Sequence, residues 1–306
     1  MPSSASNQRD RVPRARGEPR WRRTPHQDQN RHSGTRIVSA RQLIPLKDNI
    51  KLARVPLVTI ALILANVVAY LLAIRGGGSF IDGPSSATIV RYGAIPYEFS
   101  HWSQHCALGL GALGEAVLCT GQPHVTGSAG SQPATWETAF TGMFLHANIL
   151  HIAGNMLFLA VFGPTVEDRM GRVRYLGFYL LGGLAALALQ VAVAPGSTSP
   201  TLGASGAIAA VLGAYILLYP RARILTVVIL IFFFTIVELP AWTMLVLWLA
   251  FDGVLGAFGV STPFGGGAGV AYYAHIGGFA FGLLVVRAFA RRDAAPVGAT
   301  PRERAL

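Results

Sequence analysis

The sequence contains little charge, and most of its charge lies at one end. Only 13% of the 306 residues are charged, whereas 52% are hydrophobic; a soluble domain usually has about 25% charged residues. Residues 1–54 are rich in arginine and have almost no aliphatic runs. Because such a segment cannot bury enough apolar surface to fold, we expect a disordered basic tail there. The composition of the remainder indicates a membrane domain.

Cysteine is also scarce, since Cys106 and Cys119 are the only two in the sequence. Both lie in the polar region between the first and second apolar segments. Two thiols and scattered histidines are too few ligands for a metal site, so we expect no metal. If this region faces an oxidising compartment, the two cysteines can close a short disulfide-bonded loop.

The net charge of +11 comes mostly from the basic tail. Basic segments bind nucleic acid or anionic lipid. They also orient membrane proteins, because arginine and lysine are retained on the cytoplasmic side. We interpret the tail as an orientation signal and expect no nucleic-acid partner.

Apolar segments long enough to cross a membrane predict an all-α polytopic membrane protein. A spanning helix needs about 20 apolar residues. Candidates lie at residues 55–74, 149–162, 173–194, 202–219, 224–258 and 274–290. The stretch 224–258 is interrupted at Leu239-Pro240, so it can hold one span or two.

The arginine-bearing connections favour six spans. Six spans place both termini and every arginine-rich connection on the cytoplasmic side. A seventh span would put His275 on the opposite face from Ser205. We therefore predict that residues 224–237 pack along the inner side and that Pro240 begins the fifth helix. The membrane domain is then 55–292, with a long outer connection at 75–137 and a cytoplasmic C-terminal tail at 293–306.

Two polar side chains stand at the outer starts of helices in this topology. Ser205 follows a Gly-Ala pair, and His275 lies roughly 70 residues later. Burying a polar side chain in hydrocarbon costs free energy, so such residues are usually retained because they serve a function. Small residues follow each one at helical spacing, Gly206, Ala210 and Gly213 after the serine and Gly278 and Gly282 after the histidine. Packing of the two strips would bring hydroxyl and imidazole together as a nucleophile and its base.

Acyl transfer also needs donors for the oxyanion of the tetrahedral intermediate. His151 and Asn155 are four residues apart, so they share one face of the second predicted helix. Together with the Ser205 backbone N–H they can form an oxyanion hole. Polar contacts between helices are the alternative role for this pair. His146 is five residues before His151, so we expect it to point elsewhere and support the outer connection.

Several motifs together resemble the bacterial-type rhomboid intramembrane serine proteases. They are His146-Ala-Asn-Ile-Leu-His151-Ile-Ala-Gly-Asn155, Phe162-Gly163, Val166-Glu167, Gly203-Ala-Ser205-Gly206 and Ala274-His275-Ile-Gly-Gly278, and the match covers about 136–290. The resemblance implies a six-helix bundle that cleaves transmembrane helices of other membrane proteins near their outer ends, without metal or cofactor. It implies a Ser205–His275 dyad, with His151 and Asn155 as oxyanion donors. The near-exclusive use of arginine over lysine, with only Lys47 and Lys51, indicates a GC-rich bacterial genome, so we expect a multi-pass protein of the bacterial plasma membrane with both termini cytoplasmic.

The sequence departs from this family at two positions. Many bacterial rhomboids have Trp-Arg in the outer loop where this chain has Trp136-Glu137. Some relatives place a tyrosine four residues after the serine, where it stacks on the catalytic imidazole; here that position is Ala209. Something else must then orient His275.

Three alternatives stay open. Asp252 lies inside the fifth predicted helix, where a carboxylate either bridges helices or faces a cavity, or acts as a third member of a triad. A non-catalytic rhomboid-like protein would route membrane clients, but such proteins lack the serine or the histidine. A transporter would show a repeat with interrupted helices in matching halves, which the sequence does not show.

Overall fold

The computed structural model describes residues 42–111, 114–126, 129–230, 233–257 and 272–291, all within a compact unit that begins at Ala40. In these ranges, four helices are long and apolar enough to cross a membrane: α1 (Leu57–Arg75), α5 (Ile149–Met170), α6 (Arg172–Val193) and α9 (Tyr272–Phe289). Two shorter helices, α7 (Ser205–Leu218) and α8 (Ala241–Ala257), correspond to the other two predicted spans. The prediction of a helical polytopic membrane fold is confirmed.

Helix α7 is the buried centre of the bundle. All of its residues from Gly206 to Tyr215 are buried, and it packs against α5, α6 and α9. Its 14 residues make it about 21 Å long at 1.5 Å per residue, whereas the hydrocarbon core of a bilayer is about 30 Å thick. A helix this short cannot span the core alone, so at least one of its ends lies below the membrane surface.

The start of α1 is capped by an acidic residue from the end of α5. Pro56 precedes α1 and offers no side-chain cap. Instead, the buried Glu167 carboxylate accepts hydrogen bonds from the backbone N–H groups of Val58 and Thr59 at 3.0 and 2.7 Å, and from the Thr59 hydroxyl at 2.7 Å. A carboxylate satisfies the free N–H groups of a helix start and its positive dipole end. Glu167 therefore ties α1 to α5, at a distance from the predicted chemistry.

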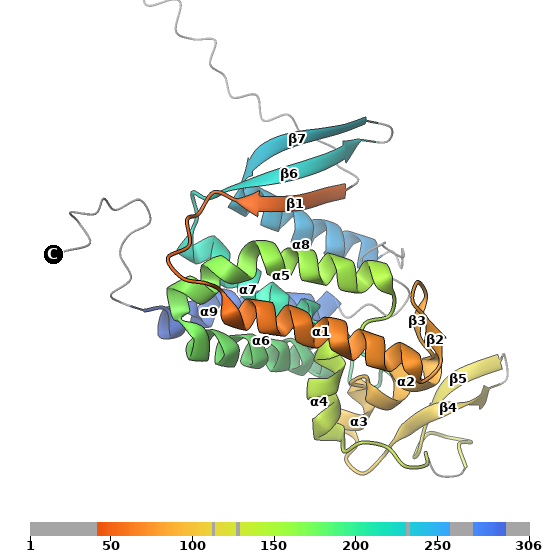
Figure 1. The fold of residues 1–306 in the computed structure, drawn as a ribbon. Helices are drawn as coiled ribbons and strands as arrows, with labels where there is room; N and C mark the ends of the chain where they lie inside the picture. The colour runs from red at the N-terminus through yellow and green to blue at the C-terminus, as the bar shows by residue number, and fades with distance from the viewer. Residues whose placement is uncertain (1–41, 112–113, 127–128, 231–232, 258–271, 292–306) are drawn as a thin grey trace, which may run out of the picture. The chain divides into compact units, whose positions relative to one another are not determined.

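A three-stranded antiparallel sheet occupies positions that we did not predict to be strands. It has the order β1 (Gln42–Asp48), β6 (Arg223–Leu230) and β7 (Phe233–Pro240), and Figure 1 shows β1 beside β6 although they are far apart in the sequence. Burial alternates along β6, where Ile224, Thr226 and Val228 are buried and Leu225 is exposed. That period of two, in a segment rich in β-branched residues, explains why it forms a strand.

This sheet adds detail to one expectation and corrects another. Residues 224–230 and 233–237, in the segment that we expected not to span, belong to the paired strands β6 and β7, and α8 begins at Ala241, one residue after the predicted start. Residues 42–48 are not disordered but form β1, with Ile44 opposite Val227 of β6. Asp48, at the end of β1, holds this strand on the helices, because its carboxylate accepts hydrogen bonds from the hydroxyls of Thr165 and Tyr215 at 2.6 and 3.0 Å. The remainder of the predicted tail up to residue 41, and residues 292–306, lie outside the described residues.

The outer connection contains a set of short elements. They are β2 (Gly78–Ser79), β3 (Gly83–Pro84), α2 (Ser86–Tyr92), α3 (Pro96–Ser100), β4 (Cys106–Gly111), β5 (Gly114–Cys119) and α4 (Thr135–Phe144). Strands β4 and β5 pair antiparallel with Cys106 opposite Cys119, and the two form a disulfide. The structure therefore contains the Cys106–Cys119 disulfide, which the sequence alone could not decide.

Backbone hydrogen bonds attach the outer connection to the segment that leads into α7. Ala94 and Thr201 exchange two such bonds, of 3.0 and 2.8 Å, and the Gly203 N–H donates to the Gly142 carbonyl of α4 at 2.8 Å. The turn before Ser205 is thus held from two sides. Trp102 and Trp136, the tryptophans of this connection, are 73% and 62% exposed.

Candidate active site

Ser205 is the first residue of α7, directly after a turn that requires glycine. Gly203 has a φ of 107°, a left-handed conformation that other residues rarely adopt. A methyl group on Gly203 would also lie 2.7 Å from His151 Nε2. The position of Ser205 therefore depends on a residue without a side chain two positions earlier.

His275 lies in the first turn of α9, and its ring reaches the serine. The distance between His275 Nε2 and Ser205 Oγ is 2.7 Å, which is a short hydrogen bond. His275 is 9% exposed. When Nε2 carries no hydrogen, the hydroxyl donates to it, and this is the path a proton takes when a serine attacks a carbonyl. The structure thus brings together the two residues that the sequence paired.

Close contact between α7 and α9 places the pair within reach. A side chain at Gly278 would collide with the backbone carbonyl of Gly206, and one at Gly282 with that of Ala210. From the other helix, a side chain at Gly213 would collide with the carbonyl of Phe279. The predicted packing of one small-residue strip on the other is confirmed.

His151 and Asn155 lie on α5 and face the same turn. The position of a methyl group on Gly203 is 2.7 Å from His151 Nε2 and 3.4 Å from Asn155 Nδ2. His151 Nδ1 accepts a hydrogen bond from the Ala147 N–H at 3.4 Å, so in the neutral ring the hydrogen is on Nε2. Both nitrogens are donors directed at the residue two positions before Ser205.

Asn155 Nδ2 has an unused donor. It is buried and makes no hydrogen bond with any part of the chain that the structure describes. Burying such a donor without a partner costs about 1–3 kcal/mol, and an orphaned group of this kind calls for an explanation. A carbonyl oxygen that acquires negative charge beside Ser205 would give it a partner.

His146 corrects a minor expectation, because it does not point away from His151. The two rings meet edge to face with centroids 5.0 Å apart. His146 is fully buried, and its Nδ1–H donates to the Phe144 carbonyl at 3.2 Å. Burial lowers the pKa of His146 from 6.5 to about 4, with the Phe144 hydrogen bond acting weakly in the other direction. We therefore interpret His146 as a neutral support for the His151 ring.

The lowered pKa predicts a loss of stability in acid. The unfolded chain binds a proton at this histidine near pH 6.5 and the folded chain only near pH 4, so stability falls as the pH drops through that window, by roughly 3 kcal/mol in total. In His146→Asn, the thermal midpoint should change less between pH 7 and pH 4.5 than in the wild type. His124→Asn, at an exposed residue with a φ of 67° that asparagine tolerates, should keep the wild-type dependence. Equal pH dependence in His146→Asn would contradict the burial effect.

An aromatic residue that we did not single out lies next to His275. The ring centroids of Trp248 on α8 and His275 are 5.7 Å apart with an interplanar angle of 42°. The one signal for such a contact in the sequence is Ala209, which has no ring where some relatives have a tyrosine. The side chain of Asp252 lies outside the described residues, so its role stays open. In the described ranges no group of three or more acidic, histidine or cysteine residues could hold a metal ion.

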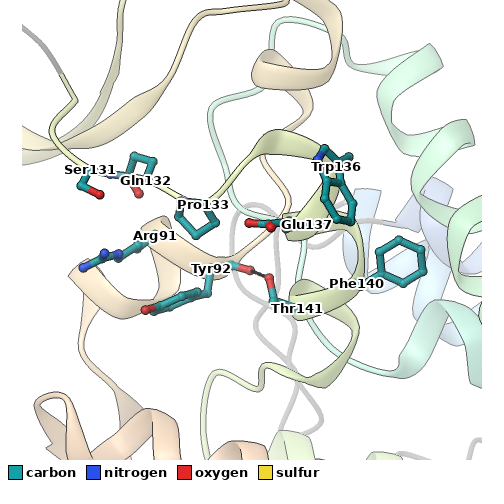
Figure 2. Close-up of a pocket in the computed structure, with 9 residues that line it drawn as sticks. All are labelled: Arg91, Tyr92, Ser131, Gln132, Pro133, Trp136, Glu137, Phe140 and Thr141. Carbon is teal, nitrogen blue, oxygen red and sulfur yellow. Dashed lines mark hydrogen bonds between the residues drawn. The ribbon is translucent and has the colours of Figure 1, made fainter.

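A cavity of about 610 Å³ opens in the outer connection, away from these residues. Figure 2 shows that its walls come from α2, α4 and the segment before α4. Thr141 closes one side by donating a hydrogen bond to the Tyr92 carbonyl at 2.7 Å. Glu137 stands where many bacterial rhomboids have an arginine. Its carboxylate accepts a hydrogen bond from the Ala134 N–H at 3.0 Å and so caps the start of α4. None of the four candidate site residues lines this cavity.

Comparisons with known proteins agree with these observations. A family model described as "Rhomboid domain" matches residues 133–292, slightly more than half of the chain. "Presenilin-associated rhomboid-like protein, mitochondrial" of Rattus norvegicus is 28% identical over 152 residues, which are 47% of this chain and 35% of that protein. "Rhomboid protein 1, mitochondrial" of Saccharomyces cerevisiae is 30% identical over 145 residues, 46% of this chain and 38% of that protein.

A plant protein is similar over a shorter region. "RHOMBOID-like protein 6, mitochondrial" of Arabidopsis thaliana is 38% identical over 72 residues, 22% of this chain and 24% of that protein. The chain spans little more than a third, or less, of the length of these relatives. All three carry mitochondrial names, so the expected bacterial type and bacterial plasma membrane are not supported. A multi-pass membrane protein is what the match and the apolar helices indicate.

Proposed function

Because the chain belongs to the rhomboid family, we propose that it is an intramembrane serine endopeptidase that cleaves transmembrane helices of other membrane proteins. The observation that carries this proposal is the 2.7 Å contact between Ser205 and His275. The unused donor of Asn155 beside the same turn supports it.

In the proposed reaction, Ser205 Oγ attacks the carbonyl carbon of the scissile peptide bond while His275 Nε2 takes the hydroxyl proton. The carbonyl oxygen becomes an oxyanion and accepts hydrogen bonds from the Ser205 N–H, His151 Nε2–H and Asn155 Nδ2–H. Removing one such donor typically costs about 3–4 kcal/mol of transition-state stabilisation.

The tetrahedral intermediate then collapses. The bond between carbon and nitrogen breaks, and His275 returns the proton to the leaving amine. Water attacks the resulting acyl-serine, again giving a proton to His275, and the second collapse releases the new carboxyl end and restores Ser205. Besides the substrate and water, these steps use the Ser205, His275, His151 and Asn155 side chains and the Ser205 backbone N–H.

The partners in this proposal are transmembrane protein substrates and the bilayer that holds them. Scissile carbonyls inside a regular helix are hydrogen-bonded, so suitable substrates carry residues that unwind easily near their outer ends. We further propose that both termini face the cytoplasm, because that orientation keeps the arginine-bearing connections there.

Cleavage in a reconstituted membrane tests this function. The full-length protein is placed in liposomes with a panel of model substrates that each have one spanning helix containing glycine or proline near the outer end. We expect a cut inside the spanning helix, located by mass spectrometry of both products, and no cut with Ser205→Ala. Cleavage that persists in Ser205→Ala would refute the assigned nucleophile. Intact substrates throughout the panel would favour the alternative of a protein that only routes membrane clients.

A further inference from the structure

The imidazole of a serine–histidine pair must be held in one orientation. The His275 ring turns about two single bonds, and its Nε2 must stay on Ser205 Oγ through the attack and then reach the leaving amine. Misplacement of a reacting group by about 1 Å can cost about 100-fold in rate. A packing partner on the ring is therefore part of what the site requires.

Helix α7 does not supply that partner in this chain. Ala209 stands where some relatives have a tyrosine, and it is fully buried. Its methyl carbon lies 3.2 Å from where a side chain at Gly278 would begin. Alanine has no ring to place against an imidazole, so α7 offers His275 no aromatic contact from residue 209.

Helix α8 places a ring beside His275 instead. Trp248 has its ring centroid 5.7 Å from that of His275. Trp248 also lies next to Phe158 of α5, whose ring centroid is likewise 5.7 Å from its own. Phe158 is 8% exposed and lies 6.0 Å from Phe162, which is fully buried. Trp248 thus packs against the buried core of the bundle on one side and against the His275 ring.

We infer that Trp248 is a positioning residue of His275 and supplies the ring contact that α7 does not. This inference rests on the proposed function. Two aromatic rings at this separation attract each other beyond what their buried area provides. The attraction increases when His275 takes the serine proton, because an indole face stabilises a cation within about 6 Å of its centroid. Trp248 therefore acts at the moment of proton transfer and contributes little to the binding of a substrate.

The kinetics of a small covalent inhibitor separate these roles. With a fluorophosphonate, Ser205 Oγ forms a bond to phosphorus, fluoride leaves, and the hydroxyl proton passes to His275. The full-length protein in detergent or liposomes gives KI for binding of the probe and kinact for the covalent step. In Trp248→Leu, which keeps an apolar side chain and removes the ring, kinact should fall about 3- to 10-fold while KI stays within twofold. Trp248→Phe, which restores a ring, should recover most of kinact.

Trp242→Leu is the matched control, because Trp242 lies on the same helix and is 53% exposed; it should keep the wild-type kinact. If Trp248→Leu folds poorly, as judged by its thermal midpoint, Trp248→Met takes its place and should show the same loss. A wild-type kinact in Trp248→Leu or Trp248→Met, or equal losses in the Leu and Phe variants, would overturn the inference. Absence of Ser205 labelling in the wild type would instead refute the proposed function, so the two failures are distinguishable.

Discussion

Ser205→Ala, His275→Ala and the double variant should all lower the rate of substrate cleavage to the same residual level, about 10⁴- to 10⁶-fold below the wild type. The serine and the histidine act as one unit: without the base the hydroxyl is a weak nucleophile, and without the hydroxyl the base has nothing to activate. In serine proteases such residues are far from additive when they are removed together.

Initial rates of product formation in liposomes, normalised to folded protein, measure this effect. Ser131→Ala and His124→Asn change an exposed serine and an exposed histidine of the outer connection, and both should keep the wild-type rate. Losses that multiply, with the double variant far below each single one, would mean that the two residues do not share one step.

Gly278→Val should abolish activity and lower the thermal midpoint of the protein. A side chain at this position meets the Gly206 carbonyl directly, and backbone cannot move aside as the end of a side chain can. The two helices must separate, which stretches the 2.7 Å contact between Ser205 and His275. Overpacking costs about 1–3 kcal/mol or more, and the displaced pair should lose at least about 100-fold in rate.

Gly177→Ala is the control for this substitution. A methyl group at Gly177 of α6 would meet one atom of Phe289 at 4.0 Å, an ordinary contact. That variant should keep full activity and gain up to about 1 kcal/mol, because alanine is the better helix former. Activity in Gly278→Val near the wild-type value would show that close approach of α7 and α9 does not set the geometry of the pair.

The site was more predictable from the sequence than the fold around it. Ser205, His275, His151 and Asn155 are polar residues in an apolar background, and the helical period fixes which of them share a face. The small residues that follow Ser205 and His275 at helical spacing also indicate which faces of the two helices pack together. The energetic cost of a polar residue in an apolar segment and the helical period of a segment both depend on residues near one another in the chain. A single sequence therefore reveals them.

The features that we missed depend on contacts between distant segments. By composition, the apolar stretch 224–237 fits a helix or a strand. Its pairing with residues 42–48, some 180 residues earlier in the chain, decides for the strand. Similarly, Trp248 is one of several aromatic residues on an apolar helix until α8 is placed against α9. The capping of α1 by Glu167, more than 100 residues later in the chain, also belongs to this class.

Mass spectrometry of the protein after treatment with a fluorophosphonate tests the pairing of Ser205 and His275 most directly. We predict a single phosphonyl adduct on Ser205 in the wild type and almost none in His275→Ala, although that variant retains the serine. An adduct on another residue, or equal modification of Ser205 with and without the His275 imidazole, would contradict the pairing.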